Sequence, residues 1–199
     1  MTRKPRTDAR DNRAGIVAAA HAVFAATAPD APVREIATHA GVAPATVYRH
    51  FPTRAALLDA VLSDRVASCE ADLRSATSDP DPWRALSATI RHFAARQIAD
   101  RALNEALFAA PGAAYADARR THAAALAMLV DRARSSGAVR PDLTVHDVRS
   151  ALLAIASLRT LPPPAANTTI TRVTNLLLSG MRTPKNALPA ALDVSYRHS

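Results

Sequence analysis

The sequence predicts an all-α protein of about nine helices. Alanine fills roughly a quarter of the 199 positions, whereas only 5 residues are glycine. This composition favours helix, because alanine loses the least side-chain entropy in a helix and glycine loses the most backbone entropy. Aromatic residues make up only 4% of the chain. Most segments therefore lack the Val, Ile, Thr and aromatic density that an all-β sandwich requires.

Three helices are expected at the N-terminus. Apolar residues share one face over residues 7–28, and the prolines within residues 29–32 end this first helix. A short helix over residues 33–40 ends at Gly41, where glycine adopts a left-handed backbone without strain. A second short helix over residues 44–51 stops there, because the ring of the following proline disfavours helical backbone at the residue before it.

The next helices are longer, and each has one apolar stripe. Thr53 is expected to cap a long helix that reaches the break at residues 78–82. Pro82 then begins a helical segment whose apolar stripe continues to Phe108. An alanine-rich helix follows and ends at Gly137, which suits a C-terminal cap.

Two helices complete the expected bundle. Thr144 and Asp147 have the spacing of a capping box, with Asp in place of the usual Glu, so a helix is expected to start there. The proline-rich residues 161–164 are expected to form a stiff loop. Apolar residues from Ile170 to Met181 mark the last helix, and a poorly ordered tail is expected after it.

The charge of the chain favours a polyanionic partner. Lys and Arg number 25 against 17 Asp and Glu, which gives a net charge of +8 and a pI of about 10.9. Almost all of this positive charge is arginine, whose planar guanidinium binds phosphate through two hydrogen bonds. A nucleic acid fits this charge as a partner.

Other classes of protein are excluded on simple grounds. Cys69 is the sole cysteine, which excludes an internal disulfide and a zinc site built from several cysteines. The apolar runs are far shorter than the roughly 18 residues that span a bilayer, and no apolar segment follows the basic N-terminus. We therefore expect no membrane contact, no secretory signal and a cytoplasmic location. The common catalytic motifs are absent, so we expect no enzyme activity, no catalytic residue, no metal and no cofactor.

The segment Glu35–Phe51 carries the most specific signal in the chain. Two short helices that cross at a glycine turn need small residues where they touch, and Ala37 and Gly41 supply them. Val47 and its apolar neighbours fill the wedge between the helices. This packing is typical of a helix-turn-helix, whose second helix is free to enter a DNA major groove about 12 Å wide. An unrelated corner between two helices is the plainer alternative.

Residues 10–65 resemble the DNA-binding domain of the TetR (tetracycline-repressor-like) family. The likeness lies in the segments 33–37, 40–42 and 46–51 and in the two residues at 53–54. It implies an all-helical, dimeric transcriptional regulator that binds double-stranded operator DNA. Such proteins are usually repressors that a small-molecule ligand releases from the operator.

The resemblance and the helix geometry together assign DNA contacts to the exposed face of the second short helix. The methyl groups of Ala45 and Thr46 can meet thymine methyls, and Arg49 can read guanine or bind a phosphate. Tyr48 and His50 are similar to family residues that contact phosphate, although a locally bonded histidine is the alternative for His50. The expected DNA-binding residues are Arg34, Ala43, Pro44, Ala45, Thr46, Tyr48, Arg49, His50, Thr53 and Arg54.

The resemblance implies that the C-terminal part holds the dimer interface. The last two helices combine aliphatic with small residues, which suits a closely packed interface between two copies of the chain. One recognition helix per duplex would also bind DNA poorly. The alternative is that both stripes face the chain's own core. The expected interface residues are Leu152, Ile155, Leu158, Val173, Leu176 and Leu177.

The resemblance also implies a small-molecule pocket in the C-terminal part. Such a pocket would use the sparse large side chains and a few polar anchors, although each of these residues is more often core or surface. The expected lining residues are Trp83, Phe93, Asn104, Leu107, Phe108, Tyr115, His122 and Met128.

These observations give four regions and one expected function. We expect a basic flexible arm at 1–9, a helix-turn-helix domain at 10–54, a ligand-binding and dimerisation domain at 55–182 and a tail at 183–199. The expected function is a homodimeric, sequence-specific regulator, released from its operator by an unknown small molecule. A helical small-molecule carrier and a non-specific architectural DNA binder are the alternatives.

Overall fold

The computed structural model describes residues 5–26, 31–109 and 115–183. All but the first residue of the predicted C-terminal tail and the first four residues of the predicted arm lie outside these ranges. Within them the chain forms nine α-helices, one short 3-10 helix and no strand, which confirms the all-α prediction. In chain order the elements are α1 (Pro5–Ala26), α2 (Val33–His39), α3 (Pro44–His50), α4 (Arg54–Ser78), α5 (Pro82–Ala99), α6 (Arg101–Ala109), α7 (Ala116–Ser135), α8 (Val145–Ser157), η1 (Leu158–Thr160) and α9 (Pro163–Met181).

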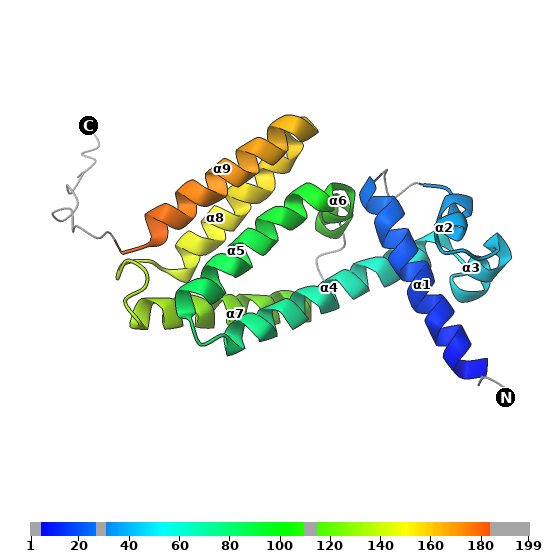
Figure 1. Ribbon diagram of the computed structural model, residues 1–199, viewed down its shortest axis with the longest axis horizontal. Coiled ribbons are helices and arrows are strands. Elements are labelled where there is room, and N and C mark those ends of the chain that lie inside the picture. Colours follow the sequence, from blue (N-terminus) through cyan, green and yellow to red (C-terminus); the bar gives the residue numbers. More distant parts are fainter. Residues whose placement is uncertain (1–4, 27–30, 110–114, 184–199) are drawn as a thin grey trace.

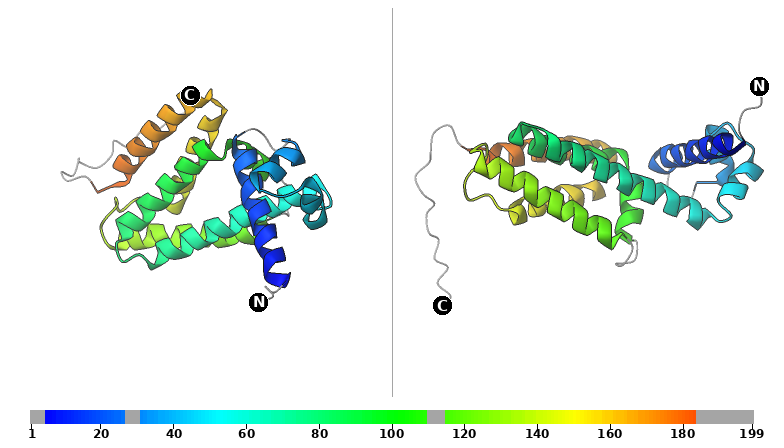
Figure 2. Two further views of the ribbon diagram at one scale, coloured as in Figure 1. Left: turned by 45° about the vertical axis from the view of Figure 1, so that its right-hand side comes forward. Right: turned by 90° about the horizontal axis from the view of Figure 1, so that it is seen from below.

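The helices form two parts along one long axis (Figure 1). Helices α1 to α3 lie at one end, α5 and α7 to α9 form a bundle at the other, and α4 runs from one part into the other. Figure 2 shows the same separation when the molecule is seen from below. Because α4 belongs to both parts, a shift of this helix moves the N-terminal end relative to the bundle.

Each part has its own apolar core. The N-terminal core holds Phe24 and Val47 together with Leu57 and Val61 from the first half of α4. The boundary expected between residues 54 and 55 therefore cuts through this core. The bundle core is built by α5, α7, α8 and α9. Leu103 of helix α6 is fully buried in the N-terminal core. Helix α6 therefore connects the bundle to this core.

The turn between α2 and α3 is centred on Gly41, as the sequence predicts. Gly41 has a φ of 65°. The N–H of Val42 donates to the carbonyl oxygen of Ala37 at 3.0 Å, and the N–H of Gly41 donates to that of Thr38 at 3.2 Å. These two bonds make a Schellman motif. Ala37 and Val47 are each 1% exposed, so the two helices meet through small apolar side chains.

Two predicted helix caps are present. The hydroxyl of Thr53 accepts a hydrogen bond from the N–H of Ala56 at 3.1 Å at the start of α4. Thr144 and Asp147 form the complete capping box of α8, with each side chain accepting from the other residue's backbone N–H. Each cap satisfies N–H groups that have no partner within the helix.

Three element boundaries differ from the sequence-based expectation. Helix α1 begins at Pro5, so residues 5–9, expected in the flexible arm, are helical. The long apolar segment after Pro82 is divided at Asp100 into α5 and α6. Helix α9 begins at Pro163 instead of after the prolines, because a proline in the first turn has no N–H to leave unpaired.

Candidate functional site

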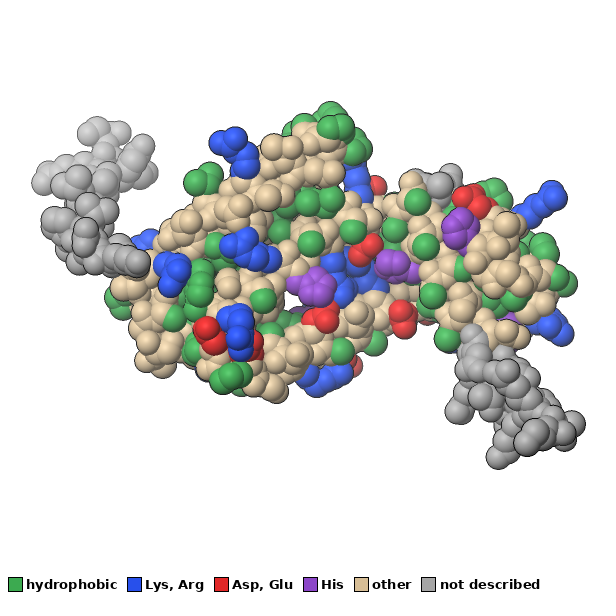
Figure 3. All heavy atoms as spheres, viewed as in Figure 1, with side chains coloured by type: hydrophobic (Ala, Val, Ile, Leu, Met, Phe, Trp, Pro, Cys, Tyr) green, Lys and Arg blue, Asp and Glu red, His purple; other side chains and the backbone are tan. Residues whose placement is uncertain are grey.

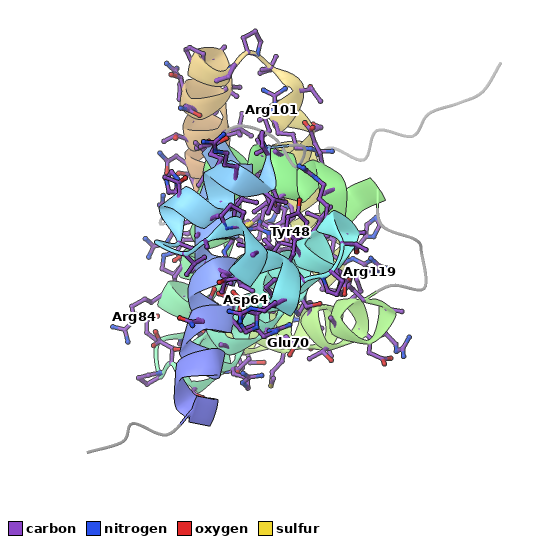
Figure 4. The ribbon with its side chains drawn as sticks, turned by 90° about the vertical axis from the view of Figure 1, so that its right-hand side faces the viewer. Tyr48, Asp64, Glu70, Arg84, Arg101 and Arg119 are labelled. Atoms are coloured by element: carbon purple, nitrogen blue, oxygen red, sulfur yellow. The ribbon has the colours of Figure 1, made fainter. Side chains whose placement is uncertain are left out.

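Helix α3 presents one exposed face at the end of the molecule. Tyr48 is 52% exposed, and Figure 4 labels it in the view onto this end. Pro44, Ala45 and Arg49 are also exposed, and Thr46 is half-buried. The Arg49 guanidinium donates to the Thr46 hydroxyl at 3.2 Å. Ala43, which precedes the helix, is exposed as well, so the expected base-reading residues share one accessible surface.

Three of the other expected DNA contacts, Thr53, Arg54 and His50, also have contacts within the chain. The Thr53 hydroxyl caps α4. The guanidinium of Arg54 lies 5.8 Å from the ring centroid of Phe24, a cation–π geometry that positions it beside α1. His50 is half-buried, with its ring tilted against that of the next residue. Arg34 is exposed on α2.

A cavity of about 510 Å³ lies among the helices of the second part. Helices α4 and α5 supply most of its wall, and α6, α7 and α8 complete it. Four of the eight expected lining residues do line it: Phe93, Asn104, Leu107 and His122. Further lining residues that the sequence did not single out include Arg65, Val66, Leu73, Gln97, Leu126 and, from the expected dimer interface, Leu152.

The other expected pocket residues do not line this cavity. Trp83 packs against the bundle core, with the guanidinium of Arg182 5.1 Å from its ring centroid. Tyr115 packs against the N-terminal core, and its hydroxyl donates to Asp59 at 2.8 Å. Met128 is 48% exposed, because it lies on the outer face of α7. The side chain of Phe108 lies outside the described residues.

A buried polar cluster connects the cavity to α1. Arg65 lines the cavity from α4 and donates to the Asp100 carboxylate and, at 2.6 Å, to the side-chain oxygen of Asn104. Asp100 in turn lies 3.7 Å from Nε2 of His21 on α1. Arg65, Asp100 and Asn104 are all buried. No sequence pattern marks this cluster, because its members are single polar residues brought together by tertiary packing.

A second group of paired charges lines the cavity. The Arg96 guanidinium donates to Asp72 at 2.7 Å and to the Cys69 sulfur at 3.1 Å. Nε2 of His92 lies 3.7 Å from the same carboxylate. Figure 3 shows histidine, arginine and acidic side chains side by side along the middle of the face seen in that view, between α4 and α5. Cys69 is half-buried within this group.

The expected dimer residues differ in how far the single chain buries them. Ile155 is fully buried within the single chain, so its side chain belongs to the core and is closed to a partner. Leu158, Val173 and Leu177 are half-buried against the same core. Leu176 is 70% exposed. Leu153, which is not among the expected interface residues, is 65% exposed. The surface of α8 and α9 therefore exposes large apolar side chains.

The part of the chain that the structure describes contains no cluster of three or more His, Cys, Asp or Glu side chains arranged to hold a metal ion. Among the described helices, none combines the length and the apolar character needed to cross a bilayer. The candidate functional site has three parts: the exposed surface of α3, the cavity, and the polar cluster that links the cavity to α1.

Two family models match the chain. Residues 16–61 match the model described as bacterial regulatory proteins of the tetR family. Residues 81–183, more than half of the chain, match the C-terminal domain of SbtR-like transcriptional regulators. The chain belongs to the TetR family. It is a transcriptional regulator that binds DNA through a helix-turn-helix, and members of this family are typically transcription factors without enzyme activity.

Similar TetR proteins match over most of their length. The TetR regulatory protein from Mycobacterium vanbaalenii is 32% identical, with a TM-score of 0.71 over 90% of this chain and 100% of that one. The TetR regulator SCO0520 from Streptomyces coelicolor is also 32% identical, with a TM-score of 0.68 over 86% and 99% of the two chains. The HTH-type transcriptional regulator TtgW from Pseudomonas putida is 37% identical over 87 residues, which span 43% of this chain and 65% of TtgW.

Proposed function

We propose that this TetR-family protein is a homodimeric, sequence-specific repressor that leaves its operator when a small molecule occupies the cavity. It acts without enzyme activity, metal or cofactor. One observation carries the proposal: Asp100 contacts both Arg65 in the cavity wall and His21 in α1. The helices next to DNA and the cavity therefore share a buried side chain.

The exposed face of α3 is the part that reads DNA. Ala45 and Thr46 offer methyl groups to thymine, and Arg49 offers two parallel N–H donors that match the O6 and N7 acceptors of guanine. Tyr48 and Arg54 flank this face and bind phosphates, which fixes the register of the helix without reading sequence.

The surface of α8 and α9 is the dimer contact. Two exposed leucines on adjacent helices, Leu153 and Leu176, can be buried only against another molecule. A two-fold interface places two copies of α3 on one duplex, and binding then requires half-sites about 34–36 Å apart or a multiple of this distance. A regulator of this kind recognises a palindromic operator.

Helix α4 transmits the state of the cavity to α3. Its first half is packed in the N-terminal core, and its second half lines the cavity. A ligand that binds better to one position of α4 shifts the population towards that position and changes the separation of the two α3 helices. A coupling of about 1–3 kcal/mol changes operator occupancy by about 5- to 150-fold.

Selection of bound DNA fragments from a random pool tests this proposal. The full-length chain is expected to enrich a palindrome and to bind it at least ~10³-fold more tightly than random DNA at the same salt concentration. A compound library is then screened for loss of fluorescence anisotropy from the labelled operator. A protein that binds all sequences equally is an architectural binder, and one that binds compounds without salt-dependent DNA affinity is a carrier; either result overturns the proposal.

A further inference from the structure

The side-chain oxygen of Gln97 is an unpartnered polar atom in the cavity wall. Gln97 lies on α5, is 3% exposed and lines the cavity. Among the described residues its side-chain oxygen has no hydrogen-bond partner. A buried amide oxygen without a donor is unfavourable, and an apolar ligand that covers it would supply no hydrogen bond. The amide therefore favours an occupant with a polar group of its own.

His122 is a second unpartnered group in the same wall. It lies on α7, and within the described chain its Nε2 has no hydrogen-bond partner. Burial lowers the pKa of His122, although the nearby Glu70 opposes this shift. The imidazole is therefore uncharged at neutral pH and offers one donor and one acceptor.

The charged residues that line the cavity already have partners of opposite charge. Moving a charged ligand out of water would require a compensating charge in the protein. A charged residue of the wall could compensate the charge of a ligand only if its own ion pair were broken. The pairs are Arg65 with Asp100, Arg96 with Asp72, and Asp79 with Arg84.

The rest of the wall is largely apolar. Phe93 comes from α5, Leu107 from α6 and Leu126 from α7, and α4 adds Val66 and Leu73. The volume of about 510 Å³ accommodates a compound of drug size. A ligand with a largely apolar surface suits this wall, because removal of that surface from water makes the free energy of binding more favourable.

We infer that the cavity takes an uncharged amphipathic small molecule, whose hydroxyl or equivalent donor–acceptor group bonds to the Gln97 amide and the His122 imidazole. The inference rests on the proposed function only in assuming that the cavity binds a ligand. It names the class of ligand: an apolar body with one or two neutral polar groups, neither an anion nor a cation.

Four probes that share one apolar body test this inference. They are 4-hydroxybiphenyl, unsubstituted biphenyl, biphenyl-4-carboxylate and 4-(aminomethyl)biphenyl, each measured at pH 7 by equilibrium dialysis with the full-length protein. The hydroxyl compound is expected to bind at least about tenfold more tightly than the other three, because it alone satisfies the amide without bringing a charge. Tighter binding of either charged probe, or no binding of any probe, overturns the inference.

Variants of α5 separate the role of Gln97 from general damage to the cavity. Gln97→Leu is expected to remove the tenfold preference for 4-hydroxybiphenyl over biphenyl. Gln97→Glu, which adds a negative charge, is expected to favour the aminomethyl probe. The matched control is Thr89→Val, because the Thr89 hydroxyl lines the same cavity but already donates to the carbonyl oxygen of Ala85 at 2.9 Å. If Gln97→Leu retains the preference, or Thr89→Val also loses it, the inference is wrong.

A separate readout keeps this inference apart from the proposed function. Release of operator DNA is measured with the same four probes by fluorescence anisotropy. Release by a charged probe alone supports the proposed function and contradicts the inferred ligand class. Preferred binding of 4-hydroxybiphenyl without any release of DNA supports the ligand class and contradicts ligand-controlled repression.

Discussion

Arg65 in α4 and Asp100, the residue between α5 and α6, form an ion pair in the interior of the chain. Arg65 is 6% exposed and Asp100 is 7% exposed. The pair joins the helix that leads to the DNA-binding end with the wall of the cavity, and His21 of α1 lies 3.7 Å from the same carboxylate. The helical segment after Pro82 breaks at Asp100, and this break places the carboxylate against Arg65 of α4.

Removing one member of this pair is expected to destabilise the fold strongly. Arg65→Met leaves the Asp100 carboxylate buried without its main partner, and we expect the free energy of unfolding to fall by about 3–5 kcal/mol. Urea denaturation followed by circular dichroism measures this loss. The double variant Arg65→Met/Asp100→Leu removes both charges and is expected to recover most of the stability. A double variant less stable than Arg65→Met would show that the pair is not the source of the effect.

Loss of a phosphate contact is expected to weaken binding to all DNA sequences alike. Arg54→Ala removes one cation next to the α3 surface, so the slope of log K against log salt should decrease in magnitude by about 1. Fluorescence anisotropy over a series of salt concentrations measures this slope. Arg74→Ala, which removes an arginine 72% exposed on the far half of α4, serves as the control and should leave the slope unchanged. Equal slopes for all three proteins would exclude a DNA contact at Arg54.

The exposed leucines of α8 and α9 are expected to hold the dimer. Leu153→Glu combined with Leu176→Glu places two carboxylates in the proposed interface, and analytical ultracentrifugation should then detect monomer. Operator affinity should fall with dimerisation, because a single α3 contacts only one half-site. Met128→Glu changes an equally large exposed residue on α7 and should leave the dimer intact. A dimer that survives the double substitution places the interface elsewhere.

Acidification is expected to destabilise the chain partly through His122. Burial lowers the pKa of this imidazole below its ordinary value of 6.5, so the unfolded chain binds a proton more readily than the folded chain. The stability from the neutral imidazole is complete above about pH 6.5 and is lost as the pH falls from there through the folded-state pKa. Thermal unfolding between pH 7.5 and 5 should show a smaller loss for His122→Gln than for the wild type. A larger loss of stability in His122→Gln than in the wild type would contradict the lowered pKa of His122.

The sequence predicts features that depend on neighbouring residues and misses those that depend on distant ones. Gly41 and the caps at Thr53 and Thr144 are local, so their positions follow from residue type alone. The cluster at Asp100 joins residues from three helices and has no local signature. The sequence predicts Tyr115 in the pocket because it is one of the few large side chains. In the structure its hydroxyl donates to Asp59, and its ring packs at the N-terminal core.

Base reading by α3 is tested most directly by comparing the DNA motifs that the wild type and Arg49→Ala select from the same random pool. If Arg49 reads guanine, the variant should lose the preference for one base pair at the same position of both half-sites, at a cost of about 1–3 kcal/mol per contact, while the other positions stay unchanged. An identical motif with unchanged affinity would contradict the role assigned to this face of α3.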